Sequence, residues 1–308
     1  MSSVWDDVVG QAHAIQQLTS AADTGPVHAY LFVGPPGSTK YQAARSFAAR
    51  VISGGDDPTQ RDARLALTGE HPDVREVRRV GASILKPQAQ EVVRLASLAP
   101  TEGSRKVMIL DEFHLLEGAA AAVMLKTIEE PPESTMFIVC ADFVPHELIT
   151  ISSRCARVDF RSIADGVIAA RLLTEGVGPA EAQAASKVAL GDLDRARLLA
   201  TDPGLAARRK AFIAAPATVD GSGAVAMRLA ADLLAMIDQA AEPLTARHED
   251  EADELTARIK EIGERGSGKK QLEDRHKREL RRYRTDEIRS GLATMAATYR
   301  DALVGGTV

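Results

Sequence analysis

The chain has 308 residues, of which 45% are hydrophobic and only 4% aromatic, and its formal net charge is −5. This length predicts two or three domains, and the hydrophobic fraction is sufficient for ordinary cores. The negative net charge excludes a molecule-wide basic field for nucleic acid, so any DNA contact must come from a local face.

The N-terminal segment is acidic and lacks the apolar core of a signal peptide, and the apolar runs elsewhere are too short to span a bilayer. The two cysteines, Cys140 and Cys155, have no CxxC partner, which disfavours a cysteine metal site and suits a reducing cytosol. We therefore expect a cytoplasmic protein without membrane contact.

The first half of the chain alternates short apolar runs with helical stretches. Tyr30–Val33, Lys106–Leu110 and Thr135–Ala141 have the composition of buried strands. Tyr41–Ile52 and the alanine-rich Gly118–Glu130 are predicted helices, and two prolines end the second one. Apolar strands that alternate with helices indicate an α/β fold with a parallel sheet covered on both faces.

Strand signals end near Ile163, where three short helices are predicted at Ile163–Glu175, Pro179–Leu190 and Asp192–Ala200. Asp192 follows a glycine and is the expected N-cap of the last of these helices.

The final third of the chain is predicted to be helical after residues 203–204. We expect a loop, an apolar helix and a final amphipathic helix, in that order, at Ala217–Gly223, Ala224–Ala241 and Leu292–Val304. The charged stretch Leu244–Arg289 is interpreted as a solvated helix or helical hairpin interrupted by Gly263–Gly268. A basic nucleic-acid arm at 269–284 is the alternative.

The segment after the first strand matches part of a phosphate-binding loop, whose pattern is Gly-x4-Gly-Lys-[Ser/Thr] between a strand and a helix. Gly34 and Lys40 are in register, but Thr39 replaces the second glycine and Tyr41 replaces the hydroxyl residue that holds Mg²⁺. We expect Lys40 still to meet an anion, with magnesium-dependent chemistry impaired. The candidate residues of this degenerate nucleotide site are Gly34, Gly37, Ser38, Thr39, Lys40 and Tyr41.

An acidic pair, Asp111 and Glu112, follows the second predicted strand. In P-loop ATPases the first carboxylate at this place helps to hold Mg²⁺ and the second polarises the attacking water. A second glycine-lysine run at residues 263–270 has no strand before it, and we interpret it as a break between helices rather than a phosphate site.

Three motifs in this order resemble the AAA+ subunits of the bacterial replication clamp loader. They are His28–Gly37, the run Leu-Lys-Thr-Ile-Glu-Glu-Pro-Pro at 125–132, and the triplet Ser153-Arg154-Cys155. By itself Arg154 would be read as a salt-bridging surface arginine. Val9-Gly10-Gln11 is similar to the segment that borders the adenine pocket in that family, and the resemblance covers about Trp5 to Leu199.

The resemblance implies three domains. An AAA+ P-loop domain with a five-stranded parallel sheet would cover residues 1–162, a small helical lid 163–203, and an all-α collar 204–308. In this family the collar holds a heteropentamer together.

Two members of the family are candidates, the gamma/tau ATPase and the related delta prime subunit, which usually does not hydrolyse ATP. Thr39 and Tyr41 depart from the gamma/tau pattern, and Asp194 stands where relatives have a nucleotide-sensing arginine. Arg195 is one residue beyond this position, so its side chain is turned about 100° around the helix from that of residue 194. Ala141-Asp142 matches the first sensor poorly, whereas Asp111-Glu112 is intact.

We therefore interpret the chain as a delta prime-like subunit that has lost its own ATP hydrolysis and supplies Arg154 as an arginine finger to a neighbour's site. The alternatives are a gamma/tau-type ATPase with an atypical loop and a non-catalytic scaffold. The implied partners are the gamma/tau and delta subunits and, through the complex, the sliding clamp and primer–template DNA.

The cofactor expectations concern nucleotide and zinc. Residual binding of ATP or ADP with Mg²⁺ stays open. No zinc is expected, because the stretch Ser53–Arg61 before His71-Pro72-Asp73 lacks the cysteines of the family's zinc module.

Overall fold

The computed structural model describes residues 2–201, 203–262 and 269–304. The chain divides into two compact units. The first unit contains residues 1–79 and 83–200, and the second contains residues 201–308 together with the short loop Val80–Ala82. Each unit has a hydrophobic interior of its own.

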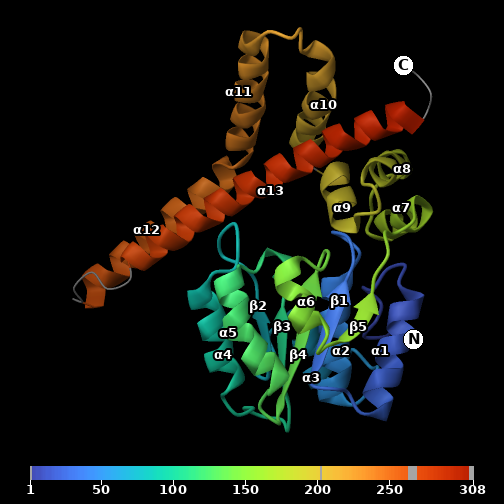
Figure 1. The fold of residues 1–308 in the computed structure, drawn as a ribbon, viewed down its shortest axis with the longest axis vertical. Helices are drawn as coiled ribbons and strands as arrows, with labels where there is room; N and C mark the ends of the chain where they lie inside the picture. The colour runs from blue at the N-terminus through green and yellow to red at the C-terminus, as the bar shows by residue number, and fades with distance from the viewer. Residues whose placement is uncertain (1, 202, 263–268, 305–308) are drawn as a thin grey trace. The chain divides into compact units, whose positions relative to one another are not determined.

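A five-stranded sheet forms the centre of the first unit, with the strand order β2-β3-β4-β1-β5 and every pair parallel (Figure 1). Its strands are β1 (Ala29–Val33), β2 (Val74–Val77), β3 (Lys106–Leu110), β4 (Thr135–Ala141) and β5 (Ala156–Asp159). The three strands predicted from the sequence are confirmed, and the sheet is the parallel α/β sheet that was expected. Because β4 lies between β1 and β3, the loops after these three strands meet at one edge.

Helices cover both faces of the sheet, as Figure 1 shows. One face carries α1 (Ala12–Thr24), α2 (Lys40–Ser53) and α3 (Arg61–Thr68), and the other carries α4 (Lys86–Ala96) and α5 (Gly118–Glu129). Successive side chains of β1 point to opposite faces of the sheet. Phe32 packs in the same cluster as Phe47 of α2, whereas Leu31 packs in the same cluster as Met124 of α5. This two-sided burial is why β1, β3 and β4 read as continuous apolar runs.

Short elements surround the carboxyl edge of the sheet. They are η1 (Phe113–Leu115), η2 (His146–Leu148) and α6 (Ile149–Ser152). The helix α6 is a single turn that leads directly into the Ser153-Arg154-Cys155 triplet.

Three further helices belong to the first unit, α7 (Asp165–Thr174), α8 (Pro179–Val188) and α9 (Leu193–Thr201). They share a small hydrophobic cluster that includes Ile168, Leu172 and Leu193. Asp192 is the N-cap of α9, as predicted, because its Oδ1 accepts a hydrogen bond from the Arg195 N–H at 2.9 Å. The expected domain boundaries at 162/163 and 203/204 stay predictions.

The second unit consists of α10 (Pro203–Thr218), α11 (Gly223–Ala240), α12 (Glu242–Ile262) and α13 (Lys269–Val304). The expected loop at Ala217–Gly223 was wrong at its start, because α10 continues to Thr218, whose hydroxyl donates to the Ala215 carbonyl. The expected separate helix Leu292–Val304 is the end of α13. The predicted break at Gly263–Gly268 lies outside the described residues.

Gly291 lies inside α13 at a close approach between this helix and α10. A Cβ atom on Gly291 would lie 2.3 Å from Cζ of Phe212 in α10, so glycine leaves room for this ring. This glycine inside a helix therefore serves packing. In the described part of the chain, no helix is long and apolar enough to cross a membrane.

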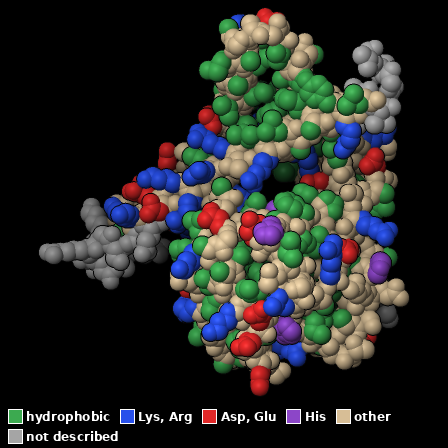
Figure 2. Space-filling view, in the orientation of Figure 1, with side chains coloured by type: hydrophobic (Ala, Val, Ile, Leu, Met, Phe, Trp, Pro, Cys, Tyr) green, Lys and Arg blue, Asp and Glu red, His purple; other side chains and the backbone are tan. Residues whose placement is uncertain are grey.

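The charged helices α12 and α13 carry both signs of charge along their length (Figure 2). Several arginines pair with carboxylates across the hairpin, among them Arg247 with Glu279 and Arg275 with Glu251. His248 and His276 stack with their ring centroids 4.0 Å apart. These contacts favour the helical-hairpin interpretation, and the basic-arm alternative at 269–284 stays a prediction.

Candidate nucleotide loop and exposed arginine

Both glycines of the loop between β1 and α2 are required by close neighbours. A Cβ atom on Gly34 would lie 2.6 Å from Cβ of Phe160, and one on Gly37 would lie 1.9 Å from Oδ1 of Asp192. Gly37 has a positive φ of 65°, and its carbonyl accepts a hydrogen bond from the Leu193 N–H at 3.2 Å. The start of α9 is therefore seated directly on the loop.

Thr39, which replaces the second glycine of the pattern, has a left-handed backbone with φ 61° and ψ 18°. Its hydroxyl accepts from the Val9 N–H at 3.2 Å and lies 3.3 Å from the Val9 carbonyl, to which it donates. These bonds offset a backbone strain of about 1–2 kcal/mol for a non-glycine residue. They also join the loop to the Val9-Gly10-Gln11 segment, a contact that sequence reasoning missed.

Lys40 is buried, and its ammonium group is already neutralised. Its Nζ lies 2.7 Å from Oδ1 of Asp142 and donates to the Pro35 carbonyl at 3.1 Å. Asp142 in turn lies 3.3 Å from Nε2 of His114, whose Nδ1 accepts from the Asp142 N–H. Burial is the main reason that the pKa of His114 is lowered, which favours the neutral ring. The sequence did not identify Asp142 or His114 as members of this site, although each follows a strand end at the same sheet edge.

Tyr41 directs its hydroxyl at Glu76 on β2. The phenol donates to Oε2 of Glu76, and the same carboxylate accepts Arg45 Nη2 at 2.7 Å. The Arg78 guanidinium lies 4.1 Å from the centroid of the Tyr41 ring. Burial, followed by the bond to Glu76, raises the pKa of Tyr41 far above its ordinary value, so the phenol stays neutral.

The acidic pair at the end of β3 lies beside arginines. Oδ1 of Asp111 accepts from the Glu112 N–H at 2.8 Å, and its Oδ2 is 3.6 Å from Nε of Arg78. Burial is the main reason that the pKa of Asp111 is raised. Oε1 of Glu112 lies 2.9 Å from Nε of Arg79. Both carboxylates thus have a guanidinium beside them where an ATPase needs a metal ion or a water.

The residues of this loop fit a magnesium-bound nucleotide poorly. The chain has no hydroxyl ligand at Tyr41, and Lys40 is held by Asp142. One observation favours a bound group: the buried Ser38 Oγ has no hydrogen-bond partner among the described residues. The loop can therefore still offer donors to an anion while lacking a magnesium ligand.

The described residues contain one group that could hold a metal ion, formed by Asp62, His71 and Glu102, whose ligand atoms lie within 4.8 Å of one another. The Arg61 Nη1 group donates to Asp62 at 2.9 Å and to Glu102 at 2.7 Å. A guanidinium therefore already supplies the positive charge between these carboxylates.

Arg154 lies at the surface, directly after Ser153, the C-cap of α6. Its Nε pairs with Oε1 of Glu129 at the end of α5, and its Nη1 donates to the Thr150 carbonyl at 2.8 Å and to Ser153 Oγ at 3.0 Å. Cys155 packs against the core beside α5, and burial raises the pKa of its thiol to about 12. The fold thus brings the 125–132 motif and the Ser153-Arg154-Cys155 triplet into contact.

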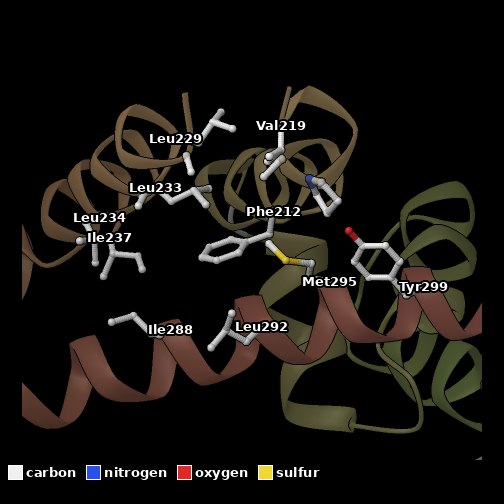
Figure 3. Close-up of a pocket in the computed structure, with 14 residues that line it drawn as sticks. Phe212, Val219, Leu229, Leu233, Leu234, Ile237, Ile288, Leu292, Met295 and Tyr299 are labelled. Carbon is white, nitrogen blue, oxygen red and sulfur yellow. The ribbon is translucent and has the colours of Figure 1, made fainter. Parts of the chain in front are cut away.

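The second unit has an apolar hollow of about 410 Å³ between α10, α11 and α13, and Figure 3 shows Phe212 among the side chains that line it. The lining is almost wholly apolar, so this hollow is suited to packing and has no catalytic constellation.

Comparison with known proteins gives one family and several relatives. Residues 10–164 match the family model described as DNA polymerase III, delta subunit. The chain is 36% identical over 175 residues to DNA polymerase III subunit tau of Bacillus subtilis, which covers 54% of this chain and 31% of that protein. It is 33% identical over 156 residues to subunit delta' of the same organism, which covers 49% of this chain and 47% of that protein. The chain thus spans less than half the length of each of these two relatives.

Solved structures include a DNA polymerase III gamma subunit-related protein from Thermotoga maritima, with a TM-score of 0.43 and 17% identity, covering 92% of this chain and 99% of that one. A RuvB variant from Thermotoga maritima has a TM-score of 0.43 and 16% identity, covering 74% and 72%.

Proposed function

Since the chain belongs to the DNA polymerase III delta-subunit family of clamp-loader proteins, we propose that it is a delta prime-like subunit of a bacterial clamp loader. It would work in the cytoplasm beside gamma/tau and delta subunits, and the complex would place a sliding clamp on primed DNA. Residues 204–308 would form the collar that holds the complex together.

The proposed chemical role of the chain is to supply Arg154 to the ATP site of a neighbouring subunit. The observation that carries this role is the contrast between two cations. Lys40 is buried beside Asp142, whereas Arg154, although it pairs with Glu129, is exposed at the surface within a family motif. A guanidinium delivered in trans stabilises the charge that develops on a transferring γ-phosphoryl group.

The state of the chain's own loop supports the loss of ATP hydrolysis. Tyr41 bonds to Glu76, and Asp111 and Glu112 each lie beside an arginine. Asp194, which replaces the lid arginine of relatives, pairs with Arg197 at 2.9 Å. Without the hydroxyl that would bind Mg²⁺ after Lys40, and without this arginine, the site lacks two of the groups that neutralise a γ-phosphate.

The test is the Arg154→Ala variant in a complex reconstituted with gamma/tau and delta subunits. The ATP site that faces this chain is expected to hydrolyse ATP about 10³-fold more slowly. The DNA-stimulated ATPase rate of the whole complex should therefore fall by the fraction that this one site contributes. Arg157→Ala is the matched control, because Arg157 is another exposed arginine, three residues later on β5. Size-exclusion chromatography should show both variants in the complex.

An unchanged ATPase rate with Arg154→Ala would contradict the proposed role and favour the non-catalytic scaffold. A gamma/tau-type ATPase is the second candidate, and the intact Asp111-Glu112 pair and the 36% identity to a tau subunit favour it. Turnover of Mg·ATP by the isolated chain would establish that candidate, and its absence would reject it.

A further inference from the structure

We infer that Glu129 is a positioning residue for Arg154, which it holds at Nε of its guanidinium so that Nη2 can meet a phosphate. This inference rests on the proposed role of Arg154. It connects the 125–132 motif with the Ser153-Arg154-Cys155 triplet, because Glu129 of the first pairs with Arg154 of the second.

The position of Glu129 is unfavourable for its own helix. Glu129 is the last residue of α5, and a carboxylate in the last turn is opposed by the negative end of the helix dipole. Glu130 and two prolines follow, so the end of this helix is fixed in place. A carboxylate there needs a cation, and Arg154 is the one it contacts.

The guanidinium of Arg154 is held at two of its three nitrogens. Nε pairs with Glu129, and Nη1 donates to the Thr150 carbonyl and to Ser153 Oγ. Ser153 itself is fixed, because its hydroxyl donates to the same Thr150 carbonyl at 2.8 Å. Nη2 carries two further N–H groups, which are the natural donors for a phosphate oxygen. A guanidinium held in this way loses less conformational freedom on binding a phosphate than the guanidinium of an unrestrained arginine does.

The ion pair is partly exposed, with side-chain exposures of 38% for Arg154 and 35% for Glu129. Exposed pairs of this kind contribute little to folding, so removal of the Glu129 charge should leave the fold intact. Its effect should appear in the orientation of Arg154 and hence in the ATPase rate.

The experiment uses the full chain in the reconstituted complex with the variants Glu129→Gln, Glu130→Gln and Arg154→Ala. Glu130 is the matched control, since it is an exposed neighbour for which no ion pair is found among the described residues. Glu129→Gln should lower the Arg154-dependent part of kcat by about three- to tenfold without changing KM, and Glu130→Gln should not. Glu129→Gln should have no further effect in the Arg154→Ala background.

A second readout needs no ATPase partner. In the isolated ¹⁵N-labelled chain, the Nε–H resonance of Arg154, assigned with Arg154→Lys, should move in Glu129→Gln and stay in place in Glu130→Gln. The inference alone fails if Arg154→Ala lowers the rate while Glu129→Gln behaves like Glu130→Gln. If Arg154→Ala itself has no effect, the proposed function fails and the inference fails with it.

Discussion

At the scale of single residues, the degenerate loop is defined as much by its partners as by its own sequence. The positive φ of Thr39 could be predicted because the motif places a glycine there. The ion pair between Lys40 and Asp142 could not be predicted, because Asp142 is 102 residues away and only the order of the strands brings it close. Glu76, the acceptor for Tyr41, is likewise 35 residues away and lies on a strand that the sequence did not reveal.

A first prediction concerns the charge next to Lys40. Asp142→Asn removes the carboxylate that neutralises the buried ammonium group, so an anion should gain attraction to the loop. We expect a fluorescent ADP analogue to bind the isolated chain about three- to tenfold more tightly in this variant. Asp253→Asn, which removes an equally negative charge from an exposed position of α12, is the control. Equal affinities for the two variants would show that Asp142 does not restrain the loop.

At the scale of elements, strands buried on both faces were the most predictable. β3 and β4 have the bounds that their apolar runs indicated, whereas β2, with its Val-Arg-Glu-Val sequence, is only partly buried and was missed. The three helices α7 to α9 were located by their glycine and proline boundaries, but the ion pairs that join them could not be read from spacing. Glu175, just after α7, accepts from Arg171 at 2.6 Å and from Arg197 of α9 at 2.6 Å.

A second prediction follows from Glu175. The bond to Arg197 is the main reason that the pKa of Glu175 is lowered from 4.5 to about 2. Because the folded-state pKa is lowered, the stabilisation is present above pH 4.5 and is lost as the pH falls from 4.5 towards 2. Allowing for partial solvent screening, Glu175→Gln should lower the free energy of unfolding by about 1–2 kcal/mol at pH 7, and the loss should shrink at pH 3.

Thermal melts at the two pH values measure this difference. Glu181→Gln is the control, because Glu181 is exposed in the first turn of α8. A loss for Glu175→Gln that is the same at pH 3 and pH 7 would mean that the ion pairs do not link α7 to α9 in the way described.

At the scale of the whole molecule, the resemblance implied three domains, and the structure has two compact units with separate interiors. The centre of the second unit was not predictable from pattern alone. Gly291 carries no signal of its own in the sequence, yet it is the place where Phe212 packs on α13. Its role depends on a contact between residues that are far apart in the chain.

The last prediction is that the two units unfold independently of each other. Phe212→Ala should lower the stability of the second unit by about 3 kcal/mol, because it opens a cavity where α10 meets α13. The chain's one tryptophan, Trp5, is buried in the first unit, so its fluorescence reports on that unit alone. The helical melt followed by circular dichroism should therefore shift to lower temperature, whereas the Trp5 transition should stay in place.

Val219→Ala is the control for that experiment, because Val219 lines the same hollow but is half exposed. If residues 204–308 hold the clamp loader together, Phe212→Ala should also reduce incorporation of the chain into the complex. Arg154→Ala, by contrast, should be incorporated normally and lose only the ATPase rate. A joint shift of both melting transitions would show that the two units unfold together, and the loss of assembly could then not be assigned to the second unit.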